Sequence, residues 1–459
     1  MAEHTDHAVV VGAGIGGLLA ARALSESHAH VTLVERDVLG DSAGPRRGVG
    51  QGRHAHGLLA RGREALEELF GGLTDELIAL GAQTGDLQSG FQWVNDGRLM
   101  CQGVSGLLGV GVSRPLLESR VRARVLALPA VELADGCTAT GLVATRDRRR
   151  VTGLRVQHRA GGGTGAEQVL DADLVVEATG RGSRGPRWLV ELGHPAPEVE
   201  QVRIDLTYAS RLYRRDPDAL DGAAVGATVA NHRGGVLIAQ EDDRWVVSLG
   251  GVLGEACPLD DAGFTAYAGT LPAPVVHDVI RSAEPLTDAV RFRHPVSTRH
   301  HYERLPDHPA GHLVFGDAMA SVNPAYGQGM TVAALQALVL RSVLRAGTHD
   351  LGGRFHRAAS RVVDGAWDVS VGADLRFPAV QGRRSPRVRA VNRYLQRLHV
   401  AAEHDPEVGT AFLRVVNLID PPQRLLAPRT AARVLRGSRR GGSPPATRPA
   451  AVVRADVAR

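Results

Sequence analysis

Three glycines near the start of the chain have the spacing of a phosphate-binding turn. They form the pattern G-x-G-x-x-G directly after the apolar run from His7 to Val11, and an apolar helical pattern follows them. Glycines at these positions let the backbone approach a diphosphate, and the start of the following helix offers free N–H groups and a positive dipole end. The residues expected to bind the diphosphate are Gly12, Gly14, Ile15, Gly16 and Gly17.

An acidic residue follows at the spacing of a ribose-binding carboxylate. The second apolar strand pattern ends in Glu35, 23 residues after Gly12, and a carboxylate at about this distance can accept hydrogen bonds from two ribose hydroxyls. A lone glycine motif also occurs in ordinary turns, but the strand, the helix and the acid together favour a bound dinucleotide. We expect Glu35 and its neighbour Arg36 to contact it. These residues alone leave open which dinucleotide binds.

A second stretch with related chemistry lies much later in the chain. The apolar strand pattern from His312 to Phe315 runs into a Gly-Asp pair that ends in Asp317, and Gly327 and Gly329 precede a helical pattern that begins at Met330. A carboxylate that leaves water is stable only when hydroxyl or N–H donors reach it. The positive end of the helix favours an anionic ligand. We therefore expect Asp317 to bind donors of a ligand and the helix start to bind a negative group.

All the basic residues are arginines, because the sequence contains no lysine. This excludes a Schiff-base lysine and a Walker A lysine. Arg53, in a Gly/Arg-rich segment, is expected to line an anion near the cofactor. Arg114 lies at the start of a helix that Ser113 is expected to cap, and its spacing fits a cofactor contact and a solvated side chain equally. His54 and His56 have no third ligand at a useful spacing, so we expect no metal site.

The composition is that of a globular protein with more than one domain. The chain has 459 residues, of which 43% are hydrophobic. The formal net charge of +5 is not concentrated in a long basic stripe, which argues against a nucleic-acid partner. The three cysteines form no C-x-x-C pair, the first residues carry no signal-peptide pattern, and no apolar run is long enough for a membrane span. We therefore expect a cytoplasmic protein without a membrane span.

Four stretches together resemble one family, the single-component FAD-dependent monooxygenases of the aromatic-hydroxylase type. The stretches are "VVVGAGIGGLLAARAL" with "VERD", "GQGRHAHGLLARG", "SRPLLESRVR" and "GDAMASVNPAYGQGMTVAALQA". In character they are closest to the actinobacterial members of the family that epoxidise or hydroxylate natural products. The resemblance covers roughly residues 7 to 435, and the Gly-Asp stretch is its most specific part.

The resemblance implies a cofactor and a role for each matching residue. Asp317 would bind the ribityl hydroxyls of FAD, and Glu35 would bind its ribose. Backbone N–H groups of Gly327, Gly329 and Met330 would lie near flavin N1 and O2. The arginines of the family match Arg53 and Arg114. One extended FAD molecule explains why two distant segments both have the chemistry of a phosphate or ribose site.

The elements that position these residues form an α/β fold. We expect a Rossmann-like FAD-binding domain of the glutathione-reductase type, with an inserted, mostly antiparallel β-sheet as substrate domain and a helical C-terminal region. The predicted segments are 1–184 and 292–365 for the FAD-binding domain, 185–291 for the substrate domain, 366–437 for the C-terminal helices and 438–459 for a disordered tail. The substrate pocket is expected between the flavin and the inserted sheet. Its candidate lining residues, which also fit a plain core, are Leu206, Tyr208, Leu237, Trp245 and Val247.

The resemblance implies a monooxygenase that acts through a flavin C4a-hydroperoxide. One oxygen atom of O₂ passes to an apolar small molecule, and we assign no catalytic side chain. Alkene epoxidation of a polyketide or terpenoid, as in antibiotic biosynthesis and other secondary metabolism, is favoured because no stretch indicates a base for phenol activation. Hydroxylation of an electron-rich aromatic, a phenol or an indole, is the first alternative. An FAD-dependent reductase and a non-enzymatic flavin-binding protein are further alternatives.

The sequence departs from the family pattern at one position. In "EATGRGSR", Thr179 stands before Gly180 where the family usually carries an aspartate. That motif is linked to the FAD diphosphate and to the handling of NADPH. The electron source is therefore open between NAD(P)H and a partner flavin reductase.

Overall fold

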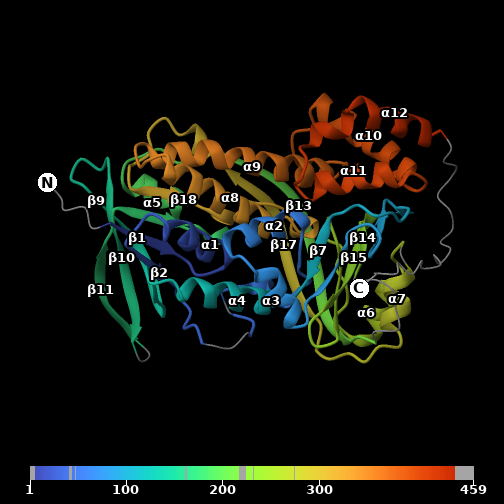
Figure 1. Ribbon diagram of the computed structural model, residues 1–459, viewed down its shortest axis with the longest axis horizontal. Helices are drawn as coiled ribbons and strands as arrows, with labels where there is room; N and C mark the ends of the chain where they lie inside the picture. Colours follow the sequence, from blue (N-terminus) through green and yellow to red (C-terminus); the bar gives the residue numbers. More distant parts are fainter. Residues whose placement is uncertain are drawn as a thin grey trace.

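The computed structural model describes residues 6–40, 44–46, 48–160, 163–216, 224–230, 232–272 and 274–439. The tail predicted to be disordered lies outside the described residues, except for Ser438 and Arg439. The molecule is elongated, with a parallel sheet and its helices toward one end and a larger sheet at the other, where the last helices also lie (Figure 1).

The parallel sheet carries the Rossmann-like half of the fold. Its strands pair in the order β18-β12-β1-β2-β8, and all four pairings are parallel. Val-rich runs, buried on both faces, suit such a sheet. The strands are β1 (His7–Val11), β2 (His30–Val34), β8 (Val131–Ala134), β12 (Leu174–Glu177) and β18 (His312–Val314).

Alternate residues of these strands enter two different cores. Ala8 and Val10 pack with the helices on one face, whereas Val9 and Val11 pack with a three-stranded antiparallel sheet on the other. The helices of the first face are α1 (Ile15–Leu24), α2 (Ala60–Leu69), α3 (Leu73–Ala79), α4 (Arg114–Leu126), α8 (Gly329–Arg345) and α9 (Leu351–Asp374). The strands of the small sheet are β9 (Cys137–Ala144), β10 (Val151–Ala160) and β11 (Gly163–Asp171), with α5 (Gly185–Glu191) beside it.

The second large sheet has the strand order β19-β17-β13-β16-β15-β14-β5-β6. Every pairing is antiparallel except the parallel pair of β14 with β5, so the prediction of a mostly antiparallel sheet is confirmed. Its strands are β5 (Phe91–Asn95), β6 (Arg98–Leu99), β13 (Val199–Arg214), β14 (Ala224–Ala230), β15 (Arg233–Gln240), β16 (Arg244–Gly251), β17 (Val290–His300) and β19 (Ala320–Ser321). The helices α6 (Asp261–Ala268) and α7 (Pro274–Ile280) pack against one face of it.

The C-terminal helices close the end of the molecule above this sheet (Figure 1). They are α10 (Pro386–Ala402), α11 (Pro406–Val416) and α12 (Pro428–Gly437), and they share a core with Leu87, Met100 and Leu107 from the first part of the chain. Ser385 and Asp405 cap α10 and α11, and each helix starts with proline, which lacks the N–H that would need a partner there. A short sheet of β3 (Gly57–Leu58), β7 (Leu108–Gly111) and β4 (Gln83–Asp86) lies between the two halves.

None of the described helices has the composition of a membrane span. The longest helix, α9, has 24 residues, which is enough for the ~20 residues of a span. It carries several arginines and aspartates along its length. Among the described residues no helix is both long and apolar enough to cross a membrane.

Candidate cofactor and substrate site

One elongated cavity of about 1500 Å³ connects the two halves of the fold. Ordinary small-molecule pockets have about 300–1,000 Å³, so this cavity has room for more than one ligand. We call its part at the carboxyl ends of the parallel strands, next to the turn 12–16, the nucleotide compartment. The part under the C-terminal helices is called the apolar compartment, and its walls include Phe91, Trp93, Val369, Leu395, Phe412, Val415, Val416 and Leu425.

The glycine turn of the nucleotide compartment has no room for side chains at two of its positions. Gly12 has φ +99°, and a Cβ there would lie 2.9 Å from the carbonyl oxygen of Ala178. A Cβ on Gly17 would lie 1.7 Å from the carbonyl oxygen of Gly12, so Gly17 sets how closely α1 packs on the turn. No atom lies within 4 Å of a Cβ built on Gly14, which faces the cavity. The turn is therefore closely packed against the protein on one side and open to the cavity on the other.

The start of α1 presents free donors to the nucleotide compartment. Gly14 is the N-cap and provides no side-chain hydrogen bond to the helix. Ile15 and Gly16 line the cavity, whereas Gly17 does not. Backbone N–H groups at an uncapped helix start, with the positive dipole end, favour an anion such as a diphosphate.

Glu35 lies beside this turn and is held by backbone donors. Its Oε2 accepts a hydrogen bond from the Ala13 N–H at 2.8 Å, and its Oε1 accepts one from the Asp37 N–H at 3.0 Å. The residue is 6% exposed and lines the cavity. The two bonds fix the carboxylate in one orientation, and each oxygen keeps a lone pair for a further donor.

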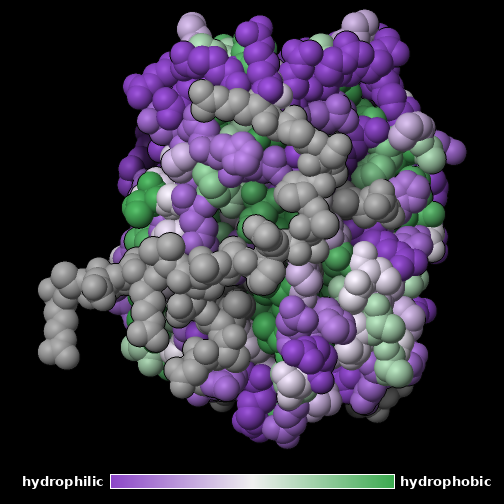
Figure 2. Space-filling model, turned by 90° about the vertical axis from the view of Figure 1, so that its right-hand side faces the viewer, coloured by the Kyte–Doolittle hydropathy of each residue, from purple (hydrophilic) through white to green (hydrophobic). Residues whose placement is uncertain are grey.

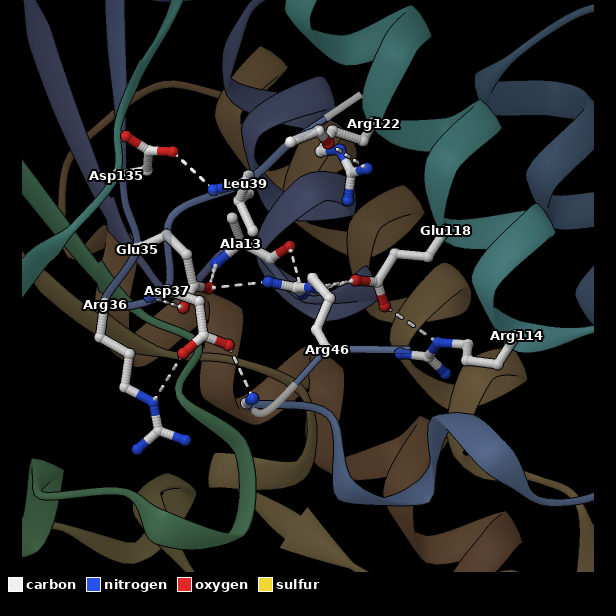
Figure 3. A network of polar contacts seen from close by, with 12 residues as sticks. Ala13, Glu35, Arg36, Asp37, Leu39, Arg46, Arg114, Glu118, Arg122 and Asp135 are labelled. Carbon is white, nitrogen blue, oxygen red and sulfur yellow. Dashed lines mark hydrogen bonds and ion pairs between the residues drawn. The ribbon is translucent and has the colours of Figure 1, made fainter. Parts of the chain in front are cut away.

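A chain of alternating charges extends from Glu35 to helix α4 (Figure 3). Arg46 Nη1 lies 3.5 Å from Glu35 Oε2, and the same guanidinium donates to Glu118 through Nε at 2.8 Å. Glu118 Oε2 then accepts from Arg114 Nε at 3.0 Å. Arg46 and Arg114 both line the cavity. Glu118 thus orients two cations toward the nucleotide compartment, as a bound diphosphate would require.

The expected arginines differ in where the structure places them. Arg114 is buried, and the N-cap bond from the Leu116 N–H to Ser113 Oγ at 3.2 Å confirms the predicted start of its helix. Arg36 lines the cavity. Arg53 is exposed at the end of the 3-10 helix Gly50–Arg53 and is not among the lining residues. Arg46, which no sequence pattern marked, takes a place in the lining.

Asp317 has no hydrogen-bond partner among the described residues, although it lines the cavity. It lies in the 3-10 helix Gly316–Ala318 that directly follows β18. Burial raises the pKa of its carboxyl group, and the nearby Arg181 and Arg114 act in the opposite direction. Such a carboxylate is stabilised by a ligand that brings hydroxyl donors. The sequence-based expectation for Asp317 is consistent with this position.

The Gly-rich turn after Asp317 lies where the two compartments meet. Gly327 has φ +67°, a left-handed conformation that glycine adopts without cost. Helix α8 begins at Gly329, one residue before the predicted start, and its N-cap residue Gln328 makes no side-chain capping bond. Gly327, Gly329 and Met330 all line the cavity. This turn therefore offers a second uncapped helix start to a ligand.

Thr179, the position that departs from the family pattern, is bound to a buried carboxyl group. Its hydroxyl and its N–H both donate to Glu177 Oε1, the latter at 3.2 Å, and the Ser183 hydroxyl donates to Glu177 Oε2. Burial raises the pKa of Glu177. Arg181, in the same loop, lines the cavity with its guanidinium carbon 4.8 Å from the ring centre of Phe292. The Arg181 guanidinium is therefore at the cavity, whereas the carboxyl group of Glu177 is buried under the loop.

The two histidines of the Gly/Arg-rich segment are embedded in the protein. His54 Nδ1 lies 2.7 Å from Ser210 Oγ, and its ring packs edge-on against Tyr208. Burial lowers the pKa of His54 to about 4 and that of His56 to about 3, so both rings are neutral at pH 7. Among the described residues, no three His, Cys, Asp or Glu side chains are grouped so as to hold a metal ion.

The predicted pocket residues divide between the two faces of the large sheet. Leu206 and Tyr208 line the cavity. Leu237, Trp245 and Val247 are fully buried in the core against α6 and α7, so their assignment to the pocket is corrected. The reason is strand alternation, which sends their neighbours to the cavity instead. The cavity-facing residues of β15 and β16 include Val236, Ile238, Ser248 and Gly250.

Aromatic and aliphatic side chains form the walls of the apolar compartment. Phe91 and Trp93 stack on each other with ring centres 4.3 Å apart and an angle of 21° between the planes. Polar side chains also line this part of the cavity, and three of them are joined by hydrogen bonds: Asn323, Tyr326 and Asp374, which we call the polar corner. On the face of the molecule next to the C-terminal helices, apolar residues gather in the middle, between more hydrophilic regions (Figure 2).

The nucleotide compartment fits FAD in shape and in chemistry. Its open glycine turn suits a diphosphate, its buried Glu35 suits a ribose, and Asp317 lacks the donors that a ribityl chain would bring. These groups are far apart in the sequence but lie close together in the fold, because β1, β12 and β18 are neighbours in one sheet. A dinucleotide that lies along the ends of these strands can reach all of them.

Comparisons with known proteins agree with this geometry. A family model described as an NAD(P)-binding Rossmann-like domain matches residues 10–61. Protein Rv3254 of Mycobacterium tuberculosis is 33% identical over 435 residues, which cover 90% of each chain. The flavin-dependent brominase Bmp2 has a TM-score of 0.67 at 14% identity, covering 94% of this chain and 98% of its own. PqsL, a probable FAD-dependent monooxygenase from Pseudomonas aeruginosa, has a TM-score of 0.60 at 17% identity, covering 81% and 98%. The two structures share the fold of this chain.

Proposed function

We propose that this chain, which belongs to one family with protein Rv3254 and shares the fold of flavin-dependent enzymes, is an FAD-dependent monooxygenase that transfers one oxygen atom of O₂ to an extended, apolar small molecule. The observation that carries the proposal is the apolar compartment, which is continuous with the nucleotide compartment and large enough for a second ligand. Natural products of the polyketide or terpenoid type have the size and the apolar character that such walls would bind.

The proposed contacts to FAD follow the geometry of the nucleotide compartment. We assign the diphosphate to the glycine turn and the start of α1, the ribose to Glu35, and the ribityl chain to Asp317. We assign the edge of the flavin ring to the turn at Gly327. When bound and reduced, FAD supplies the activation of O₂. Arg46 and Arg114 are proposed to offset the charge of the diphosphate, with Glu118 keeping both in place.

The walls of the apolar compartment are proposed to orient the substrate and to keep water away from the reacting carbon. Among the oxygen transfers open to such an enzyme, alkene epoxidation requires the least from these walls, because no proton has to leave the substrate. An apolar slot that holds a double bond is sufficient. Epoxidation is therefore our first candidate reaction.

Hydroxylation of an electron-rich aromatic ring is the second candidate. The stacked pair of Phe91 and Trp93 supports it, because two aromatic rings at one wall offer a flat surface against which a phenol or an indole can pack. For either reaction the electrons would come from NAD(P)H or from a partner flavin reductase. We favour the reductase because Thr179 replaces the aspartate that the family pattern associates with NADPH.

The test is a single turnover under ¹⁸O₂. The FAD-loaded protein is reduced anaerobically with light, mixed with 2-vinylnaphthalene and 2-naphthol, and then exposed to ¹⁸O₂. We expect ¹⁸O in the epoxide of the alkene. Label in the naphthol with the alkene returned intact would reverse the order of the two reactions. A protein that binds FAD but labels neither probe would contradict the proposed function for these substrate classes.

A further inference from the structure

The polar corner of the apolar compartment contains a buried carboxyl group that the proposed oxygen transfer does not use. Asp374 is the last residue of α9 and is 1% exposed. Its Oδ1 accepts hydrogen bonds from Asn323 Nδ2 and from the Tyr326 hydroxyl, each at 2.9 Å. Its Oδ2 is buried and has no hydrogen-bond partner among the residues that the structure describes. Both Asp374 and Tyr326 line the cavity.

The hydrogen bond to Asp374 determines which kind of group Tyr326 can recognise. A phenol has one proton to donate, and Tyr326 donates it to Asp374 Oδ1. Its oxygen then presents only lone pairs to the cavity, so it can accept a hydrogen bond but cannot donate one. A substrate group next to Tyr326 must therefore carry an O–H or an N–H. An ether, a ketone or a plain alkene has no such proton.

The position of Tyr326 connects this group to the proposed cofactor site. Tyr326 ends the 3-10 helix Pro324–Tyr326, and the next residue is Gly327, to which we assign the edge of the flavin ring. The Asn323 side chain fixes this loop twice, because its Oδ1 also accepts from the Ala325 N–H at 3.0 Å. A substrate that reaches Tyr326 is therefore held beside the proposed flavin position.

Charged groups surround the polar corner on several elements. Arg376, just after α9, faces both Asp374 and Tyr326, and it pairs with Asp96 from the β5–β6 turn at 2.6 Å. His399 of α10 is buried near Asp96 and Arg376, and burial lowers its pKa to about 4. Burial raises the pKa of Asp374 to about 7 in spite of its two donors. The carboxyl group can therefore gain or lose a proton near neutral pH.

We propose that Tyr326 and Asp374 form a proton-accepting pair that recognises an acidic O–H or N–H of the substrate, such as that of a phenol or an enol. The inference rests on the proposed function, since it concerns the substrate of the same site. It selects, among apolar molecules, those whose reacting carbon is conjugated to such a group, and it therefore favours hydroxylation, the second candidate reaction, over epoxidation of a plain alkene. Loss of the proton makes that carbon more electron-rich and so more reactive toward an electrophilic oxygen.

The proton movement needs no further reactant. The substrate O–H donates its proton to the oxygen of Tyr326, and the hydroxyl proton of Tyr326 moves to Asp374 Oδ1. The substrate becomes an anion, Asp374 becomes a neutral acid, and Tyr326 is regenerated. After oxygen transfer the proton returns along the same two bonds. Tyr326 touches the substrate directly, whereas Asp374 acts through it as a positioning and proton-storing residue.

The experiment uses binding of two probes that differ by one proton donor. 2-Naphthol and 2-methoxynaphthalene are titrated into the FAD-loaded protein, and ionisation of the naphthol is followed by its absorbance difference spectrum. We expect the naphthol to bind about ten-fold more tightly than the ether, the worth of one hydrogen bond to a charged pair, with a naphtholate band that grows as pH rises through about 7. Tyr326→Phe and Asp374→Asn should remove both the preference and the band.

A matched control is available on the same helix. Asp368 also lines the cavity, but the Tyr326 hydroxyl donates to Asp374 and not to it, so Asp368→Asn should keep the preference and the band. Equal binding of the two probes to the wild-type protein would overturn the inference, and so would a preference that survives in Tyr326→Phe. These outcomes leave the proposed function standing if ¹⁸O still enters the alkene probe. Failure to label any probe counts against the proposed function and not against the proton-accepting pair.

Discussion

The nucleotide compartment is shaped mainly by the backbone, whereas the apolar compartment is shaped mainly by side chains. In the first, glycine conformations and two helix starts present N–H groups, and Glu35 is held by backbone donors. In the second, the walls come from β5, α9, α10 and α11, which are far apart in the sequence. A backbone-shaped site tolerates few substitutions and keeps one ligand. A site shaped by side chains can change its ligand while the fold stays the same.

The charges of the two compartments differ in the same way. The nucleotide compartment has a chain of four alternating charges whose two arginines line the cavity. The apolar compartment has the polar corner, where burial raises the pKa of the Asp374 carboxyl group more than the hydrogen bonds from Tyr326 and Asn323 lower it. We propose that the first arrangement holds a diphosphate and that the second selects one polar group on an otherwise apolar molecule.

The largest effect is expected from Gly17→Ala. Its Cβ would lie 1.7 Å from the Gly12 carbonyl oxygen, a backbone atom that cannot rotate away. We expect loss of folded, FAD-binding protein, seen as a colourless or insoluble product. Gly14→Ala is the control, because its Cβ meets no atom within 4 Å. That variant should fold normally and bind FAD about ten-fold more weakly, since the added methyl group stands where the diphosphate is proposed. Equal stability of the two variants would contradict this account of the turn.

Substitutions of the two carboxylates that are proposed to bind FAD should have the next largest effect. Glu35→Ala and Asp317→Ala each remove an acceptor for ligand hydroxyls, so we expect each to weaken FAD binding by about 1–3 kcal/mol. The measurement is flavin retained after dialysis, followed by titration of the apoprotein with FAD. Phe412→Ala, in the wall of the apolar compartment, should leave FAD affinity unchanged within about two-fold. If both carboxylate variants keep full flavin, the assignments of Glu35 and Asp317 are wrong.

Substitution of Thr179 should have a smaller effect on the rate of flavin reduction, and this effect should depend on the neighbouring Glu177. We expect slow anaerobic reduction of the bound flavin by NADPH alone, and faster reduction in a variant that restores the aspartate. Thr179→Asp by itself would place a carboxylate against Glu177, which the Thr179 hydroxyl now donates to, and should cost about 1–3 kcal/mol of stability. The double variant Glu177→Gln/Thr179→Asp should recover this loss, and Glu177→Gln is its control. Rapid bleaching of the wild-type flavin by NADPH would refute the premise.

The smallest effect concerns the dependence of stability on pH. The pKa of Asp374 rises from 3.8 to about 7 in the folded state, so between these values the unfolded chain releases a proton that the folded chain keeps. Stability therefore falls as pH rises through this window, by about 1 kcal/mol per pH unit. The variant Asp374→Asn has no carboxyl group at this position, so this pH dependence of its stability is absent. In urea titrations the variant should gain about 1 kcal/mol on the wild type between pH 5 and pH 6, and a constant difference would contradict a raised pKa.

The sequence predicted those parts of the site whose residue types are required by the backbone. The strand predicted at His7 to Val11 is β1 to the residue, and the cap at Ser113 is present. Asp317 lines the cavity, where a strand that runs directly into a Gly-rich turn places it, and its role toward a ligand stays a prediction. Trp245 was misplaced because alternation along a strand shows two faces but not which one α6 and α7 will cover.

Other residues carried no local pattern that sequence reasoning could use. Arg46 lies in a segment without a periodic pattern, and its importance depends on Glu118, which reaches it from α4. Tyr326 and Asp374 are 48 positions apart and meet only when α9 ends beside the Gly-rich turn. An acidic residue at the end of a helix is also common in solvated positions. The carboxyl group that bears on the choice between epoxidation and hydroxylation was therefore visible only in the fold.

The strand order of the two large sheets has a consequence for how the chain is made. During synthesis β5 can pair only with β6 until β14 has been made, and β12 can pair only with β1 until β18 has been made. The parallel sheet is therefore complete only after residue 314, and the large sheet only after β19. Such late, long-range pairings slow folding and expose strand edges that invite aggregation. Excising residues 185–291 as a separate module would remove β14, one of the two partners of β5, so this segment is not an independent folding unit.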